Sequence, residues 1–291
     1  MHPAISVIIF TALSGLGFGM MVFLGLGMLD VSGWVAFTFV AIAYALAGGG
    51  LLSSLFHLGH PERFLKAFTQ WRSSWLSREA VLSMAAMGVF GIYALLWIFM
   101  DNRIEWLGYL AAFLSVLTIF STSMIYAQMK SVPRWHTPMT SVMYLMYGFA
   151  GGALLTTQVV LAGWLMLALA IVQIATWVLG DGAFAKTGSD MGTATGLGFL
   201  GKVRLLEKPH TGTNYLMSEM IHVIGRKHIM KLRIIGLGLG SVIPAVLLLA
   251  LPANHMIALV VILVHMVGLF AQRWLFFAEA EHVVDLYYGQ R

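Results

Sequence analysis

Residues 53–79 read SSLFHLGHPERFLKAFTQWRSSWLSRE and separate two long apolar runs. The segment holds two histidines, four basic residues and two acidic residues, although only 10% of the chain is charged. Ionisable groups are costly to place in a membrane protein, so those beside apolar spans mark functional sites. We therefore expect this segment to form the mouth of a functional site.

The composition of the whole chain indicates an integral membrane protein. Of the 291 residues, 59% are hydrophobic and the mean hydropathy is +0.86, which excludes an ordinary soluble domain. The chain has no cysteine, so it cannot supply disulfides, thiolate metal ligands or the cysteine ligands of an iron–sulfur cluster. Any iron–sulfur cluster must then belong to a partner subunit.

Apolar runs of about 20 residues predict eight transmembrane helices in one all-α, polytopic membrane domain, residues 1–291. The first run is too long for a signal peptide and no Lys or Arg precedes it, so we expect it to be retained. Almost no connecting residues separate the fifth and sixth helices. The predicted helices cover residues 4–28, 33–56, 80–100, 106–128, 138–157, 159–180, 232–251 and 255–277.

The distribution of basic residues predicts the orientation of the chain. Of the 17 Lys and Arg residues, all but Arg103 fall on the side of the membrane that carries the N-terminus. Cytoplasmic segments are enriched in Lys and Arg, so both termini are predicted to be cytoplasmic. A long loop, residues 181–231, lies on the same side, and a binding partner is expected there.

Within residues 53–79, His57 and Glu79 are the candidates for chemistry. An imidazole at a helix end can donate a hydrogen bond to a quinone carbonyl and exchange a proton near neutral pH, and Glu79 could relay a proton from the aqueous phase. Both residues also have structural alternatives. His57 could be an interfacial anchor, and Glu79 could lie in the first turn of a helix capped by Ser77, where a carboxylate suits the helix dipole.

Four further residues are predicted to bind the same quinone. Arg134 and His136 flank Trp135 in a connection bracketed by prolines, where they are either a wall of the site or anchors to lipid headgroups. Arg273, near the end of the eighth helix, could close the site or extend to the headgroups. Arg78 completes the predicted quinone-binding set.

No metal site is predicted in this chain. A b-type haem between helices needs two axial histidines at matching depth, and only His265 lies well inside a predicted span. His265 is instead expected to be a hydrogen-bonded packing residue or part of a proton path. A secondary transporter would carry charges or broken helices near mid-membrane, and the predicted spans are nearly free of both.

Several short motifs at helix ends resemble the membrane anchor subunit of dimethyl sulfoxide reductase-type molybdoenzymes. They are His57-Leu58-Gly59 with Pro61, Ser77 with Glu79, Val132-Pro133 with Trp135, and Thr137-Pro138. The resemblance implies an anchor without haem that exchanges electrons between a quinone, ubiquinone or menaquinone, and a four-cluster iron–sulfur subunit. It also implies a molybdopterin-containing catalytic subunit, and it assigns His57 and Glu79 to the quinone site.

Residues 202–231 read KVRLLEKPHTGTNYLMSEMIHVIGRKHIMK and are similar to the anchor of a cytoplasmic-facing sulfite dehydrogenase that reduces quinone. This similarity implies electron flow from sulfite, through molybdenum and iron–sulfur subunits on the cytoplasmic side, into quinone in a bacterial cytoplasmic (inner) membrane. The chain is not expected to be catalytic alone. The alternatives are the anchor of a quinol-oxidising, dimethyl sulfoxide reductase-like complex, a purely structural anchor, or a transporter.

Overall fold

The structure of the chain, a computed structural model, describes residues 4–56, 60–207, 212, 227–252 and 254–288. Within these ranges every regular element is a helix or a helical turn, as the composition predicted. The longer helices are α1 (Ile5–Gly25), α2 (Gly33–Leu55), α3 (Trp75–Met100), α4 (Glu105–Ala127), α5 (Pro138–Leu155), α6 (Val159–Asp181), α11 (Ile229–Leu237), α12 (Ile243–Ala250) and α13 (His255–Ala278). The shorter elements are η1 (Pro61–Phe68), α7 (Ala183–Lys186), α8 (Met191–Thr195), η2 (Gly198–Leu200), η3 (Gly238–Val242) and η4 (Val283–Tyr288).

In the described part of the chain, seven helical segments are long and apolar enough to cross a membrane. They are α1, α2, α3, α4, α6, the continuous segment from α11 to α12, and α13. The eighth predicted span is α5, whose 18 residues include Tyr, Thr, Ser and Gly and which is not among the seven. At 1.5 Å per residue α5 is about 27 Å long, close to the thickness of a bilayer core. The crossing by α5 stays a prediction.

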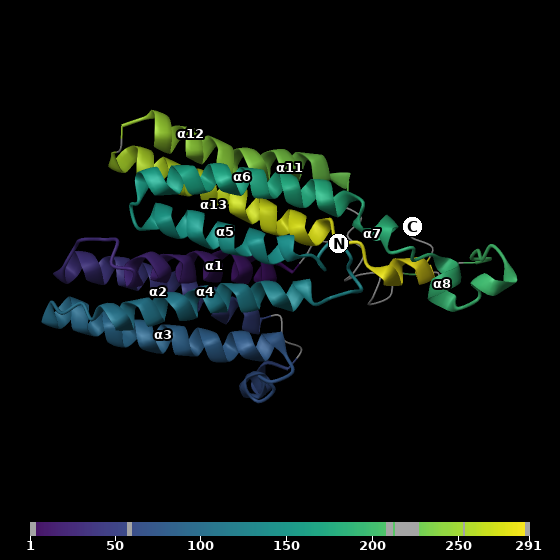
Figure 1. Cartoon of the computed structure of the whole chain (residues 1–291), viewed down its shortest axis with the longest axis horizontal. Coiled ribbons are helices and arrows are strands. Elements are labelled where there is room, and N and C mark those ends of the chain that lie inside the picture. Colours follow the sequence, from purple (N-terminus) through teal and green to yellow (C-terminus); the bar gives the residue numbers. More distant parts are fainter. Residues whose placement is uncertain (1–3, 57–59, 208–211, 213–226, 253, 289–291) are drawn as a thin grey trace.

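The long helices form two groups that lie side by side (Figure 1). The first group is α1, α2, α3 and α4, and the second is α5, α6, α11, α12 and α13. α1 and α5 pack against each other where the groups meet. Since α5 has protein on both sides, against α1 and α6, it needs fewer lipid-facing apolar side chains than the other helices do.

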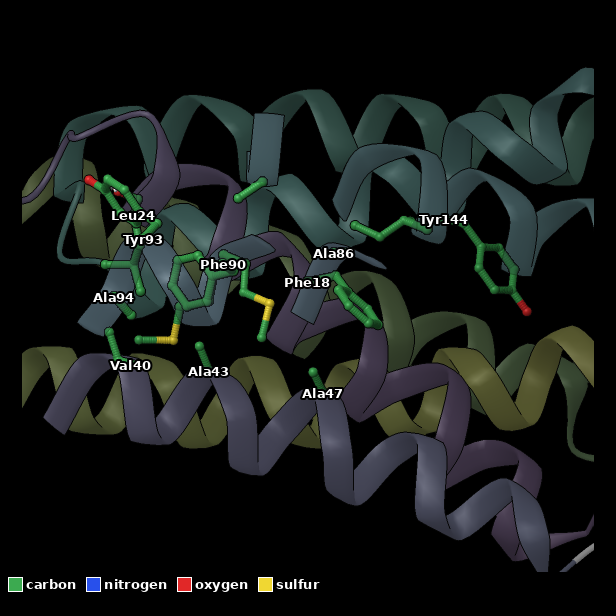
Figure 2. Close-up of a cluster of buried hydrophobic side chains, with 14 of the residues drawn as sticks. Phe18, Leu24, Val40, Ala43, Ala47, Ala86, Phe90, Tyr93, Ala94 and Tyr144 are labelled. Atoms are coloured by element: carbon green, nitrogen blue, oxygen red, sulfur yellow. Dashed lines mark hydrogen bonds between the residues drawn. The ribbon is translucent and has the colours of Figure 1, made fainter. Parts of the chain in front are cut away.

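The core of the first group combines small and aromatic side chains. Ala43 and Ala47 on α2 face the rings of Phe18 on α1 and Phe90 on α3 (Figure 2), and all four are buried. Inside a membrane the hydrophobic effect does not bring helices together, because the lipid tails are also apolar. Close packing must therefore hold the helices together, and small side chains permit it. The alanines therefore let α2 lie close to two aromatic neighbours.

Glycines on α1 allow three other helices to approach its backbone. A Cβ atom added at Gly17 would overlap the backbone of Ala47 on α2, and one at Gly19 would overlap the carbonyl of Gly148 on α5. A Cβ atom at Gly25 would lie 2.5 Å from a backbone oxygen of α4. α1 is consequently the central helix of the bundle, and glycine at these positions sets its distance from each neighbour.

The polar segments gather at one end of the bundle, which we call the basic end. It comprises the start of α1, residues 60–74, 128–137, 182–207 and 279–288. In Figure 1, α7, α8 and η4 project from this end beyond the long helices, and η4 packs on α8. The opposite end, the far end, is made of short connections such as residues 26–32, 101–104 and 156–158. α1 begins and α13 ends at the basic end, so the first and last long helices have these helix ends on one side.

Two sequence predictions change at this point. α3 begins at Trp75 rather than at residue 80, with Ser74 at the N-cap position, so the prediction that Ser77 caps this helix was wrong. The apolar run begins at residue 80, whereas the helix itself starts about one turn earlier.

Most of residues 202–231, which carried the sulfite dehydrogenase resemblance, lies outside the described residues.

The contact between Gly19 and Gly148 gives a test of the packing. We expect Gly19→Ala to force α1 and α5 apart and to cost about 1–3 kcal/mol, because an added methyl group has no space there. The control is Gly15→Ala on the same helix, where a Cβ atom meets nothing within 4 Å. Thermal unfolding of the detergent-solubilised protein measures both, and equal melting temperatures would contradict the assignment of α1 as the central helix.

Candidate functional site

The described part of the predicted site is centred on Glu79, which lies one turn inside α3. Its side chain is buried, with 3% of its surface exposed. The hydroxyl of Thr122 on α4 donates a hydrogen bond to its carboxylate. Because α3 starts at Trp75, Glu79 is not in the first turn. The helix-dipole alternative is therefore not supported, and a buried carboxylate with one hydroxyl partner remains to be explained.

Two tyrosines connect Glu79 with the opposite charge of Arg273. Tyr126 on α4 and Tyr144 on α5 are both buried, and their ring centres are 5.9 Å apart. Each lies within electrostatic range of both the Glu79 carboxylate and the Arg273 guanidinium. We call the set Glu79, Thr122, Tyr126, Tyr144 and Arg273 the interior site.

Arg273 on α13 is held by aromatic rings rather than by a carboxylate. Its side chain is 1% exposed, and the guanidinium carbon lies 3.8 Å from the ring centre of Tyr144 and 5.4 Å from that of Tyr147. Among the described residues Arg273 forms no ion pair, and its Nε atom has no hydrogen-bond partner. The interior site therefore contains a buried cation and a buried carboxyl group that do not touch each other.

Two predicted residues lie away from the interior site. Arg78 donates hydrogen bonds to the carbonyls of Trp71 and Arg72, and its guanidinium lies 4.3 Å over the ring of Trp75. It thus secures the segment that leads into α3. His136 is exposed at the basic end, and its Nδ1 atom lies 2.7 Å from the carbonyl oxygen of Ala127. His57, the central residue of the sequence prediction, lies outside the described residues.

Arg134 belongs to a different structure, which we call the ionic cluster. It contacts Asp181 at the end of α6 at 2.7 Å and Glu279 after α13 at 3.3 Å. Arg233 on α11 contacts the same two carboxylates, at 2.6 Å for Glu279 and 2.9 Å for Asp181. Burial raises the pKa of the Glu279 carboxyl, and both arginines oppose that rise. The ionic cluster joins four segments of the basic end with no net charge.

A small cavity lies beside the ionic cluster, among side chains of α5, α6 and α13. Its volume is about 20 Å³, enough for about one water molecule. The Nε atom of Arg134 and the Oε1 atom of Gln272, both from lining residues, are buried without a hydrogen-bond partner in the described structure. The lining residues are Arg134, Trp135, Thr140, Met143, Thr176, Trp177, Gln272, Phe276 and Glu279.

The tyrosines and Thr122 do not stand out in the sequence, because neutral polar residues are common in membrane helices. A helical projection could have found them, since Thr122 and Tyr126 are four residues apart and so lie on one face of α4. Asp181, Arg233 and Glu279 were likewise not predicted as partners of Arg134. No group of three or more His, Asp or Glu residues suited to a metal ion occurs in the described ranges.

Comparison with known proteins places this chain in a family. The family model described as DMSO reductase anchor subunit (DmsC) matches residues 1–279. A sulfite dehydrogenase subunit of Allochromatium vinosum is 30% identical over an alignment 329 residues long, gaps included. The alignment covers 99% of this chain and 99% of that protein. No solved structure matches the chain. The match extends over nearly all of the helical bundle, and the chain belongs to the family of dimethyl sulfoxide reductase anchor subunits.

Proposed function

We propose that this chain is the quinone-reactive subunit of a multisubunit oxidoreductase in a bacterial inner membrane, and that it passes electrons from an iron–sulfur partner to a quinone. The interior site carries the proposal, because a buried carboxyl group and a buried guanidinium share two tyrosine neighbours without pairing. A charged side chain costs about 3 kcal/mol at the centre of a membrane helix and less near its ends. A purely structural anchor would have no use for two such charges.

The interior site carries hydrogen-bonding groups that suit a quinone headgroup. The carbonyl oxygens of a quinone accept hydrogen bonds, and the Tyr144 hydroxyl and the Arg273 Nε atom are buried donors without partners in the described ranges. The tyrosine rings offer flat apolar surface beside these donors. A bound quinone would take two electrons from the partner subunit and two protons from the aqueous phase, becoming a quinol.

Each charged residue of the interior site has a distinct role in this proposal. Arg273 provides a fixed positive charge, which stabilises negative charge that develops on a nearby carbonyl oxygen. Glu79 holds and passes on a proton, and the hydrogen bond from Thr122 fixes its carboxyl group. His57 stays a sequence-based prediction for the same site.

We propose sulfite as the electron donor of the assembled complex, since a relative over 99% of the chain is named a sulfite dehydrogenase subunit. Sulfite gains one oxygen from water to become sulfate and releases two electrons and two protons, which matches the needs of quinone reduction. Iron–sulfur clusters would reside on partner subunits, because this chain has no cysteine to hold them. We place molybdopterin on a partner subunit as well. The projecting elements α7, α8 and η4 give those partners a surface at the basic end.

Substitution of Glu79 tests the interior site. We expect Glu79→Gln to lower quinone reduction by the intact complex about 100-fold, because the amide keeps the shape but cannot carry the proton. Sulfite oxidation with ferricyanide, which draws electrons from the partner subunits, should be unchanged. Glu105→Gln, at an exposed position in the first turn of α4, is the matched control and should keep full activity. Unchanged quinone reduction in Glu79→Gln would remove Glu79 from the site.

The predicted orientation can be tested cleanly because the chain has no cysteine. We expect Asn102→Cys, exposed at the far end, to react with a membrane-impermeant maleimide in intact cells. Lys186→Cys, exposed at the basic end, should react only after the cells are opened. Labelling in the reverse order would place the basic end outside and would contradict docking of cytoplasmic partners.

A further inference from the structure

Fully buried polar atoms without partners gather on one side of the bundle. Six of them lie in the second group of helices or in the connection that enters it, and none has a hydrogen-bond partner in the described structure. They are Arg134 Nε, Tyr144 Oη, Gln173 Oε1, His265 Nε2, Gln272 Oε1 and Arg273 Nε. Buried polar groups almost always have partners, above all in a membrane, where no bulk water reaches them. Such a concentration needs an explanation.

The side chains that carry these atoms form a row of spatial neighbours, which starts at the basic end. Arg134 and Gln272 line the cavity next to Glu279. Thr140 lines the same cavity, and Tyr144 follows it one turn later on the same face of α5. From Tyr144 the contacts continue to Arg273, at 3.8 Å. The cavity and the interior site are therefore about one helical turn apart.

The same row of side chains continues past Arg273 to His265, in the middle part of α13. Arg273 lies 5.4 Å from the ring centre of Tyr147, whose hydroxyl accepts a hydrogen bond from Gln173 at 2.7 Å. The His265 ring centre is 6.1 Å from that of Tyr147, and its Nδ1 atom lies 2.8 Å from the carbonyl oxygen of Gly240 in η3. Along α13, His265 is about 20 Å from the helix end at the basic side.

We infer that the second group of helices encloses water, which runs from the cavity beside Glu279 past Gln272 to the interior site and delivers protons there from the basic end alone. Water satisfies the unpaired atoms, since each buried molecule makes about three hydrogen bonds to groups of this kind. The cavity has room for about one molecule and two polar atoms ready to bind it. The inference rests on the proposed function, because the protons serve quinone reduction.

Two features stop protons from crossing to the far end. The buried positive charge of Arg273 lies between the cavity and the deeper polar atoms, and a fixed cation repels a hydrated proton. Beyond Gln173 and His265 the interior is apolar, with Met166 and Val261 fully buried. The water-filled region is consequently closed on its far side, and it serves the site without conducting protons across the membrane.

Two buried methionines give a direct test for the enclosed water. Brief X-ray radiolysis of the intact complex makes hydroxyl radicals wherever water lies, and mass spectrometry locates the oxidised residues. Met143 lines the cavity and is 3% exposed, whereas Met166 lies in the apolar core and is 0% exposed. We expect Met143 to be oxidised at least about tenfold faster than Met166, although bulk solvent reaches neither. Equal, slow oxidation of both would overturn the inference.

The delivery of protons is tested with Gln272→Leu, which removes a polar group from the cavity. We expect quinone reduction to fall about tenfold and its solvent deuterium isotope effect to increase, while sulfite oxidation with ferricyanide stays unchanged. Gln158→Leu makes the same change at the far end, where Gln158 bonds the Met28 carbonyl, and should leave quinone reduction unaffected.

The two proposals can fail separately. If Glu79→Gln leaves quinone reduction unchanged, the proposed function of the interior site fails, whatever the methionine oxidation shows. If Glu79→Gln slows quinone reduction but Gln272→Leu changes neither the rate nor the isotope effect, only the proton route fails.

Discussion

The interior of this bundle depends on keeping two opposite charges apart. In a low-dielectric medium, a buried carboxylate and guanidinium would be most stable as a hydrogen-bonded pair. Here Glu79 comes from α3 and Arg273 from α13, and Tyr126 and Tyr144 lie within electrostatic range of both. A direct ion pair would use up the hydrogen-bonding capacity of both groups. Separation costs stability but leaves donors and a carboxyl group available to a ligand.

The ionic cluster and the interior site illustrate this difference. In the ionic cluster, Arg134 and Arg233 share the carboxylates of Asp181 and Glu279, so every charge has a close partner and the sum is zero. That arrangement ties four segments of the basic end together and has little capacity left for a ligand. Arg273, by contrast, has aromatic neighbours and no carboxylate in contact within the described ranges. The charged groups of the ionic cluster and Arg273 thus differ in the partners that surround them.

Much of the architecture could be read from the sequence, because lipid imposes a simple requirement of length and apolarity on each span. The helix breaks and the gathering of polar segments at one end followed from it, whereas the roles of Glu79 and Arg273 stay predictions. The start of α3 did not, because interfacial residues such as Trp75 suit both a helix and a connection. Nor could the sequence separate Arg134 from Arg273, since each is an arginine near a helix end. Only the packing of α13 against α5 shows that their surroundings differ.

The asymmetry of the two ends has a consequence for energy conservation. The elements α7, α8 and η4 project at the basic end, and the cavity beside Glu279 lies at that end too. The far end has short connections and an apolar interior behind them. If electrons and protons both reach the quinone from the basic end, each quinol forms without net movement of charge through this chain. Moving one charge across 100 mV takes about 2.3 kcal/mol. An oxidoreductase of this design would therefore deliver its electrons without working against the membrane potential, and would leave the building of that potential to whichever enzyme oxidises the quinol.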